Sequence, residues 1–173
     1  MNDHHVQFFT ATIFKWKHLL KPAKYKQIII DSFYYLTEKG KCSIYGFVIM
    51  PNHIHVIWKI NDGYKRADVQ RDFLKFTGQQ IKFDLIDNYP DFLEKFRVDL
   101  KDRQYQFWQR NPLSIDLYSC RTIEQKLEYL HLNPLQERWD LVTSPEDYYF
   151  SSASFYETDH SDFSFLKHYG DEC

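Results

Sequence analysis

The sequence predicts an α+β fold in which helices pack against an antiparallel sheet. Segments rich in aromatic and β-branched residues alternate with segments whose apolar residues recur at helical spacing. Pro51 and Asn52, a tight-turn pair, separate the two central strand segments, which predicts an antiparallel hairpin. Hydrophobic residues make up 43% of the 173 residues, enough apolar material for the core of one domain.

The first half of the chain predicts three strands and one helix. Residues 6–16, VQFFTATIFKW, alternate and are rich in aromatic and β-branched side chains, as expected of a strand. Helical spacing begins after Pro22 and ends at Gly40, a common helix stop signal. Residues 41–50 and 53–60 predict the two strands of the hairpin.

The second half predicts two helices with a strand between them. Apolar residues return to helical spacing over residues 68–87, and a loop region follows. The segment RQYQFWQR, residues 103–110, predicts the fourth strand. Residues 122–134 predict a short final helix, because Thr122 and Gln125 match a capping box and the last residue is a proline.

The predicted order is therefore β-α-β-β-α-β followed by a helix, which is the ferredoxin-like split βαβ arrangement. Two helices back one face of the antiparallel sheet, and the final helix is available to cover the other face. We expect one domain over residues 1–156 and a C-terminal tail over residues 157–173. The polar, acidic tail fits either a capping segment or a disordered end.

Composition excludes several classes of protein. No apolar run approaches the roughly 18 residues that cross a bilayer, and the N-terminal residues lack the pattern of a signal peptide. Cys42, Cys120 and Cys173 form no CxxC pair, which argues against a disulfide framework or a zinc cluster. We therefore expect a reduced, cytoplasmic protein.

Two histidines lie one residue apart in the strand predicted over residues 53–60. Side chains at i and i+2 of a strand point the same way, so His53 and His55 share a face. The opposite face consists of Ile54, Val56, Trp58 and Ile60, which we expect to pack on the two backing helices. Two adjacent imidazoles can bind a metal ion. Such a pair is also found as ordinary polar residues on a half-exposed strand.

The final helix offers further groups for a metal site. Tyr129 and Asn133 are four residues apart and therefore lie on one helix face. Leu127 and Leu130 lie towards the other side and can anchor the helix. If the helix covers the open face of the sheet, Asn133 can present its carbonyl oxygen as a third ligand, with Tyr129 close to the metal. His131 points away from Tyr129, which favours a structural or solvated role.

Four segments in this order resemble the REP-associated tyrosine transposases: VIMPNHIHVIW, FWQR, YLHLNP and PEDYYFSSASFY. These proteins are related to the single-tyrosine transposases of bacterial insertion sequences, within the HUH nuclease superfamily. The resemblance extends from the first strand to about residue 156. It implies that His53 and His55 bind a metal, that Tyr129 is the nucleophile and that Asn133 is the third ligand, where the insertion-sequence relatives carry Gln.

The resemblance implies a metal-dependent nuclease and strand transferase that cleaves single-stranded DNA near hairpins through a 5′-phosphotyrosine. Nitrogen and oxygen ligands without a thiolate suit Mg²⁺ or Mn²⁺. Two alternatives stay open: a domesticated protein that binds hairpin DNA without cutting it, and a metal-dependent hydrolase that uses water. The insertion-sequence relatives work as dimers, some of which exchange the catalytic helix, whereas the REP-associated branch can act as a monomer. The resemblance therefore leaves both a monomer and a homodimer open for this chain.

The net charge of −2 departs from the basic balance expected of such a protein, so DNA contact depends on local clusters of cations. Arg71, Lys75 and Lys82 fall within about 40° of one another on the helical wheel, as a phosphate track or an ordinary solvated face would. Phe107 and Trp108 are candidates for stacking on bases, although core packing is the favoured role for at least one of them. The residues that we expect to contact DNA are Lys65, Arg66, Arg71, Lys75, Lys82, Arg110 and Lys126.

Overall fold

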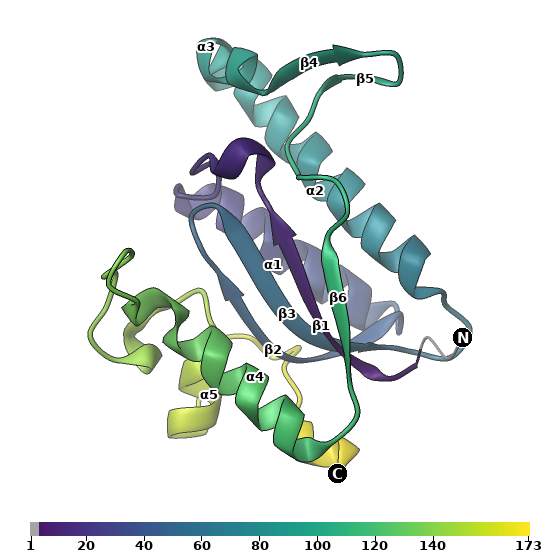
Figure 1. The fold of residues 1–173 in the computed structure, drawn as a ribbon, viewed down its shortest axis with the longest axis vertical. Coiled ribbons are helices and arrows are strands. Elements are labelled where there is room, and N and C mark those ends of the chain that lie inside the picture. The colour runs from purple at the N-terminus through teal and green to yellow at the C-terminus, as the bar shows by residue number, and fades with distance from the viewer. Residues whose placement is uncertain (1–3) are drawn as a thin grey trace.

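The computed structural model describes residues 4–173 around a four-stranded antiparallel sheet (Figure 1). The strand order is β2-β3-β1-β6, and each neighbouring pair is antiparallel. The bounds of these strands are β1 Val6–Thr12, β2 Cys42–Ile49, β3 His53–Ile60 and β6 Leu113–Leu117. The two inner strands, β3 and β1, have partners on both sides.

Helices cover both faces of this sheet. Helices α1 (Ala23–Glu38) and α2 (Arg66–Asn88) lie behind it, and α4 (Cys120–Leu132) crosses in front (Figure 1). This arrangement confirms the predicted ferredoxin-like fold. Shorter elements complete the chain: η1 Phe14–Trp16, α3 Pro90–Leu93, η2 Glu94–Phe96, β4 Arg97–Leu100, β5 Arg103–Tyr105, η3 Asn133–Leu135, η4 Pro145–Asp147, α5 Ala153–Thr158 and η5 Tyr169–Glu172. None of the helices in residues 4–173 has the length and apolar character needed to cross a membrane.

Alternation along β3 divides the core into two layers, as the sequence predicts. Trp58 is fully buried on the face that packs on α1 and α2, where it stacks on Phe9 and meets Phe73 edge to face. Ile57 points the other way, into the layer under α4 that also holds Leu127 and Leu130. Burial of these side chains fixes the register of β3, because a shift of one residue would exchange its two faces.

Helix α4 lies close to the sheet because β2 has a glycine beneath it. A methyl group built on Gly46 would collide with the side chain of Leu127 and come close to Ser152. Leu127 therefore packs directly on the backbone of β2. This close approach sets the height of α4 above the face that carries His53 and His55.

The fourth strand of the sheet is not the predicted segment 103–110. Residues Arg103–Tyr105 form β5, which pairs with β4 in a separate two-stranded sheet, and β6 takes the place beside β1. The aromatic residues after β5 are buried for another reason: Trp108 packs near Gly78 of α2, and its Nε1 donates a hydrogen bond to Thr77. Sequence pattern cannot separate a buried aromatic segment of this kind from a strand.

Two predicted element boundaries also shift. Strand β1 ends at Thr12, not at residue 16, and both Lys15 and Trp16 adopt a left-handed φ of 55°. Helix α4 starts at Cys120 rather than residue 122, because Ser119 is its N-cap and its side chain accepts a hydrogen bond from the Thr122 amide. The capping box predicted for Thr122 and Gln125 is therefore wrong, since a serine one turn earlier supplies the cap.

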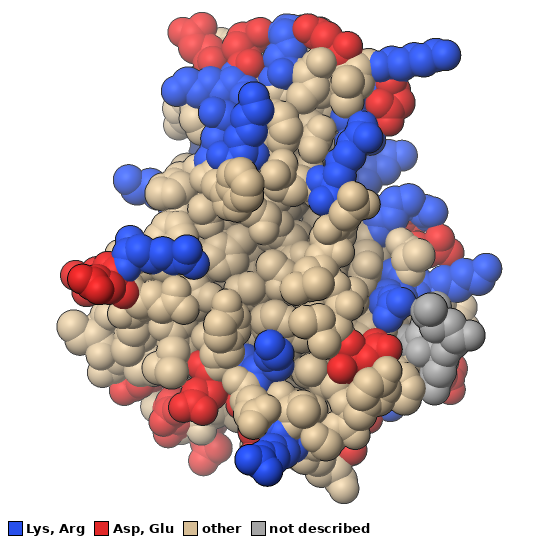
Figure 2. Space-filling model, viewed as in Figure 1, with Lys and Arg blue, Asp and Glu red and all other residues tan. Residues whose placement is uncertain are grey.

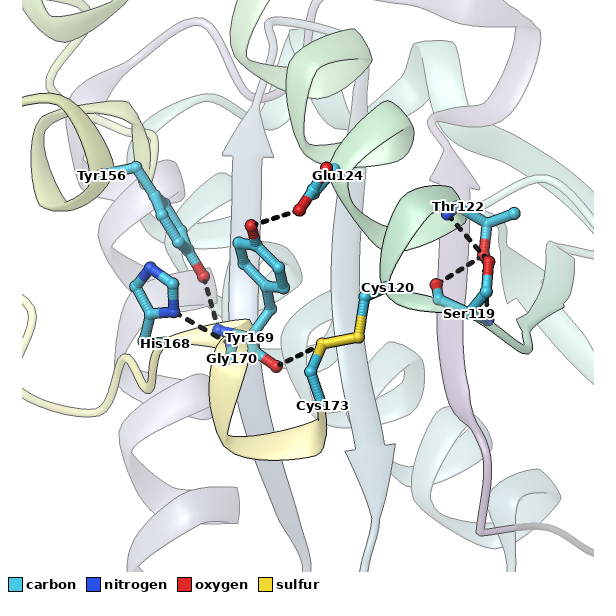
Figure 3. Close-up of a disulfide and its surroundings, with 9 residues drawn as sticks. All are labelled: Ser119, Cys120, Thr122, Glu124, Tyr156, His168, Tyr169, Gly170 and Cys173. Atoms are coloured by element: carbon cyan, nitrogen blue, oxygen red, sulfur yellow. Dashed lines mark hydrogen bonds between the residues drawn. A yellow bond between two sulfur atoms is a disulfide. The ribbon is translucent and has the colours of Figure 1, made fainter.

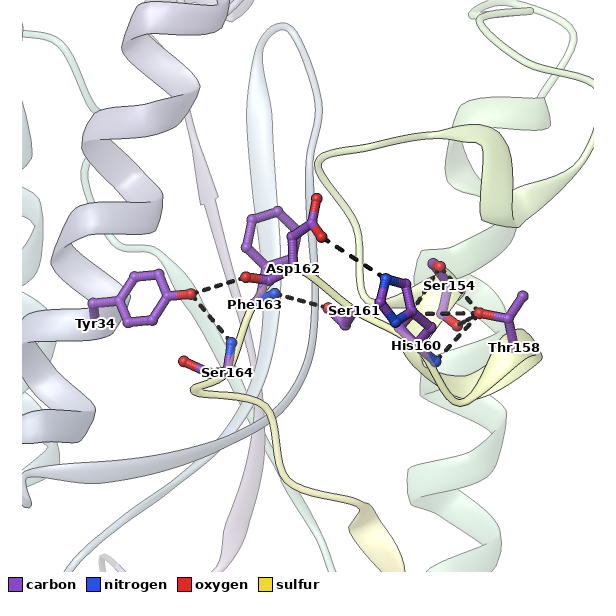
Figure 4. Close-up of polar contacts among 8 residues, drawn as sticks. All are labelled: Tyr34, Ser154, Thr158, His160, Ser161, Asp162, Phe163 and Ser164. Carbon is purple, nitrogen blue, oxygen red and sulfur yellow. Dashed lines mark hydrogen bonds and ion pairs between the residues drawn. The ribbon is translucent and has the colours of Figure 1, made fainter.

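The C-terminal tail is a packed segment. Phe163 and Phe165 are buried in the layer behind the sheet. The Tyr34 hydroxyl of α1 donates a hydrogen bond to the Asp162 carbonyl and accepts one from the Ser164 amide (Figure 4). Of the two alternatives for this tail, a capping segment and a disordered end, the structure shows the first.

The tail also reaches the start of α4. Cys173 and Cys120 form a disulfide bond, and the Tyr169 hydroxyl donates a hydrogen bond to Glu124 at 2.7 Å (Figure 3). The expectation that the cysteines stay reduced is therefore wrong for this pair. Their separation of 53 residues carries no local motif, so the pairing follows from the way the tail folds back.

We predict that reducing this disulfide lowers the free energy of unfolding. Chain-entropy arguments for a closed loop of this length give about 4 kcal/mol as the expected loss. Urea unfolding with and without dithiothreitol measures it. Cys173→Ser should unfold alike in both conditions, whereas Cys42→Ala should keep the sensitivity, because Cys42 is a free cysteine. Equal wild-type midpoints, with the bond verified by mass spectrometry, would contradict the prediction.

Candidate active site

Two imidazoles lie side by side at the start of β3. The ring centroids of His53 and His55 are 4.8 Å apart, and the two side chains are 9% and 5% exposed. Opposite them in β1 stand Thr12 and Thr10, respectively. The alternation of β3 places both rings under α4, as the sequence predicts.

A hydrogen bond holds the same nitrogen of each ring. Nδ1 of His53 lies 2.7 Å from Oδ1 of Asn52, and Nδ1 of His55 lies 2.7 Å from the hydroxyl of Thr10. Phe8 stacks on the His55 ring, with their centroids 5.0 Å apart. Because Nδ1 is engaged in both rings, Nε2 is the nitrogen that each can offer to a cation.

Helix α4 brings a tyrosine and a lysine to these rings. The Tyr129 ring meets His55 edge to face at 5.5 Å and Phe8 at 6.0 Å. Lys126, one turn earlier, places its Nζ 5.5 Å from the centre of the Tyr129 ring. Tyr129 is 46% exposed. One side of the phenol thus faces the histidines while the other is open to a substrate.

Asn133 lies directly after α4, where the helix tightens into η3. The side chain is 1% exposed, and within residues 4–173 neither its Oδ1 nor its Nδ2 has a hydrogen-bond partner of ordinary geometry. Leaving such a buried group unpaired costs about 1–3 kcal/mol. Asn133 is near enough to His53 to influence its pKa. A buried amide oxygen without a partner beside two imidazoles fits the role of a cation ligand.

Both imidazoles are neutral at physiological pH. Burial lowers the pKa of His53 to about 4, with a further contribution from the positive charge of Arg138, while the Asn133 side chain acts in the opposite direction. Burial also lowers the pKa of His55 to about 3, assisted by His53 and Lys126. Neutral rings have a free lone pair, which is the form that binds metals.

The donor set fits a divalent cation with mixed nitrogen and oxygen ligands. In the part of the chain that the structure describes, no group of three or more His, Cys, Asp or Glu side chains gathers as a metal site. A site at this position would therefore consist of His53, His55 and the Asn133 carboxamide. Such a set leaves positions for oxygen atoms of a substrate, as expected of a catalytic ion.

A basic groove lies between α2 and residues 102–112, with a volume of about 740 Å³. Figure 2 shows Lys and Arg gathered over α2 and the β4–β5 hairpin, at the top and right of the view. Arg71 forms ion pairs with Asp68 and Asp72. Among the described residues, three other cations that line the groove form no ion pair within 4 Å: Lys75, Lys82 and Arg110.

The remaining cations of the predicted DNA surface lie elsewhere. Lys65 lines a separate hollow of about 320 Å³, which Arg71 also borders. Arg66 forms an ion pair with Asp116 of β6 at 3.3 Å. Lys126 stands beside Tyr129. The seven predicted residues thus divide between the groove, the separate hollow, the ion pair with β6 and the active site.

The groove wall is joined to the end of β1. The Gln109 amide donates a hydrogen bond to the Thr12 carbonyl at 2.7 Å, and the Phe14 amide donates one to the Phe107 carbonyl at 2.8 Å. Thr12 is the register partner of His53. The groove wall therefore lies next to the segment that leads to the histidines.

The two aromatic residues considered for base stacking pack in the core, which is the role that the sequence favours for at least one of them. Phe107 and Trp108 are each 8% exposed and pack in the core. Trp16 is 65% exposed, and its carbonyl oxygen accepts a hydrogen bond from Nδ2 of Asn52. Sequence reasoning also missed Asn52 and Thr10 as partners of the histidines. The position of Asn52 directly before the histidine pair was a signal, whereas nothing local marks Thr10.

His131 has the structural role that the sequence favours. It is 7% exposed, and its Nε2 lies 2.7 Å from the hydroxyl of Ser152. The Ser152 hydroxyl is also hydrogen-bonded to the backbone of Phe47. This chain of contacts ties α4 to β2 on the side of the helix away from Tyr129. Burial lowers the pKa of His131 to about 4.

We predict that stability falls as the pH decreases from about 6.5 towards about 4. In this window the unfolded chain protonates His53, His55 and His131, whereas the folded chain keeps them neutral. Each ring then contributes a slope of up to about 1.4 kcal/mol per pH unit. Urea unfolding from pH 7 to pH 4 should show a smaller slope for His55→Gln. Replacing the exposed His160 by Gln should leave the slope unchanged; an equal slope in both variants would contradict the assignment.

Comparison with known proteins agrees with this fold. No protein-family model matches the chain, and no curated protein matches its sequence. A solved structure of a REP-associated tyrosine transposase bound to a REP hairpin aligns with a TM-score of 0.67 and 17% identity, over 96% of this chain and 93% of that one. A transposase candidate from Deinococcus radiodurans R1 aligns with a TM-score of 0.47 and 10% identity, over 73% and 88%. The chain has the fold of a REP-associated tyrosine transposase.

Proposed function

We propose that this protein is a metal-dependent tyrosine transposase of the REP-associated type, which cleaves and rejoins single-stranded DNA near hairpins. The observation that carries the proposal is the placement of Tyr129 against His55, with the buried Asn133 carboxamide beside His53. Four side chains from β3 and the end of α4 thus converge at one place. A protein that binds DNA without cutting it has no need of this combination.

Tyr129 acts as the nucleophile in the proposed reaction. Its hydroxyl oxygen attacks the phosphorus of the scissile phosphodiester, and the bond from phosphorus to the 3′ oxygen breaks. The phenolic proton leaves to solvent on the open side of Tyr129, and the departing oxygen takes up a proton. The products are a 5′-phosphotyrosine and a free 3′-hydroxyl. Attack by another 3′-hydroxyl reverses the step and joins strands, so no nucleotide cofactor is required.

The other residues of the site assist this attack. A Mg²⁺ or Mn²⁺ ion, when bound, polarises the scissile phosphate and offsets the charge that develops on it. His53, His55 and Asn133 would hold the ion. Lys126 lies on the same helix face as Tyr129 and adds a positive charge near the developing phenolate and the phosphate. The stacking of Phe8 on His55 keeps the site rigid.

The basic groove is the proposed binding surface for the DNA hairpin. The solved structure with the same fold is bound to a REP hairpin, and among the described residues three of the cations that line the groove here form no ion pair within 4 Å. Phosphates of a hairpin stem would contact Lys75, Lys82 and Arg110. The single-stranded segment at the foot of the stem would then continue past the end of β1 towards Tyr129.

We predict a covalent intermediate between Tyr129 and DNA. Incubation with Mn²⁺ and a pool of single-stranded hairpin oligonucleotides should give an adduct that resists denaturation and maps to Tyr129 by mass spectrometry. Tyr129→Phe should abolish the adduct, because it removes the attacking oxygen. Tyr35→Phe is the matched control, since Tyr35 is also exposed but lies on α1, behind the sheet. Cleavage without an adduct would instead indicate a hydrolase, and retained hairpin binding without cleavage would indicate a binding protein.

We also predict that the cations of the basic groove contribute to hairpin binding. The double substitution Lys75→Ala and Arg110→Ala should weaken hairpin binding and lower the salt dependence, with the slope of log K against log salt reduced by about two. Lys39→Ala, an exposed lysine at the end of α1, should leave both quantities unchanged. Fluorescence anisotropy between 50 and 300 mM NaCl, about the range in which counterion release is resolved, measures this. An unchanged slope in the double variant would place the DNA elsewhere.

A further inference from the structure

Asn52 connects two parts of the molecule that meet at the active site. It lies in the turn between β2 and β3, directly before His53. Its Nδ2 donates a hydrogen bond to the carbonyl oxygen of Trp16 at 3.4 Å, and its Oδ1 lies 2.7 Å from Nδ1 of His53. The side chain thus bridges the turn after β1 and the first imidazole of the pair.

The orientation of this amide determines which nitrogen of His53 carries the proton. A carbonyl oxygen can accept a hydrogen bond but cannot donate one, so the amide NH₂ group must be the part that faces the Trp16 carbonyl. Oδ1 consequently faces His53 and requires a proton on Nδ1. In a neutral ring with the proton on Nδ1, Nε2 has the free lone pair.

The backbone around Asn52 is held firmly enough to maintain this orientation. The Ile13 amide donates to the Asn52 carbonyl at 2.8 Å, and the Leu20 amide donates to the Pro51 carbonyl at 2.9 Å. Residues 13–20 are therefore hydrogen-bonded to the backbone of both turn residues, Pro51 and Asn52. Trp16 itself adopts a left-handed φ of 55°, a conformation that costs a bulky residue free energy and that the surrounding contacts sustain.

His55 is held differently. The hydroxyl of Thr10 can either donate to or accept from Nδ1, so it orients the ring without selecting the position of the proton. The stacked ring of Phe8 restricts the imidazole plane as well. Of the two histidines, His53 is therefore the one whose tautomer a neighbouring side chain dictates.

We propose that Asn52 is a positioning residue, which accepts a hydrogen bond from Nδ1 of His53 and thereby presents Nε2 as a ligand to a divalent cation. The inference rests on the metal site of the proposed function and adds to it the residue that prepares that site. Outer partners of this kind typically contribute roughly 10- to 100-fold to metal affinity. Thr10 gives His55 the orientation but not the choice of tautomer.

The proposal predicts a direct signature in the metal-free protein. Long-range ¹H–¹⁵N correlation spectra at pH 7 should show His53 with its proton on Nδ1. In Asn52→Leu, which keeps the size of the side chain and removes the acceptor, His53 should shift towards the tautomer with the proton on Nε2. A wild-type spectrum with the proton of His53 on Nε2 would overturn the proposal, and this result does not depend on whether any variant folds.

Metal affinity provides the second readout. Titration of the DNA-free protein with Mn²⁺, followed by calorimetry, should show affinity weakened roughly 10- to 100-fold in Asn52→Leu. Asn52→Asp keeps an acceptor oxygen and should bind within a few-fold of wild type. Asn61→Leu is the matched control, because Asn61 follows the other end of β3 and bonds to the Gly40 carbonyl.

The outcomes separate this inference from the function on which it rests. A wild-type protein that binds no Mn²⁺ would overturn the metal site itself. A wild type that binds, together with an equally tight Asn52→Leu variant, would overturn the positioning role alone. Weakening shared by Asn52→Leu and Asn61→Leu would indicate a general loss of structure, and would also count against a specific role for Asn52.

Discussion

Strand β3 is covered on both faces. This constraint determines both the packing layers of the core and the environment of His53 and His55. The strand pairs with β1 and β2, packs on α1 and α2 with one set of side chains, and lies under α4 with the other. A polar group in such a strand is costly unless it has a partner. His53 and His55 have partners at Nδ1, and burial keeps both rings neutral. The fold thus holds two neutral imidazoles in a place where charged groups would be unstable.

Helix α4, which covers the face of β3 that carries His53 and His55, places further polar side chains beside the two imidazoles. Gly46 allows Leu127 to rest on the backbone of β2, which brings α4 down to the level of the histidines. The same helix turns Tyr129 towards His55 and ends at Asn133. The apolar side of α4 determines the height of the helix, and its other side places Lys126 and Tyr129 next to His55. One helix therefore supplies core packing through Leu127 and candidate site residues such as Tyr129.

Periodicity explains which features could be predicted from the sequence. The two faces of β3, the helical face shared by Tyr129 and Asn133, and the anchoring role of Leu130 all follow from spacing along one element. The errors arose where tertiary contacts override local pattern: Trp108 is buried against α2 in a segment that resembles a strand, and Ser119 caps α4 one turn before the expected start. Thr10 could not be found, because its role depends on the register of β1 against β3.

The disulfide between Cys120 and Cys173 limits the ways in which two copies could assemble. It ties the first residue of α4 to a tail that packs on the body of the same chain. Two copies that exchanged α4 alone would have to carry this bridge from one subunit to the other, which would link them covalently. An exchange without such a link would have to move the helix and the whole tail together. In the oxidised protein the covalent topology therefore favours an arrangement in which Tyr129 lies beside the histidines of its own chain.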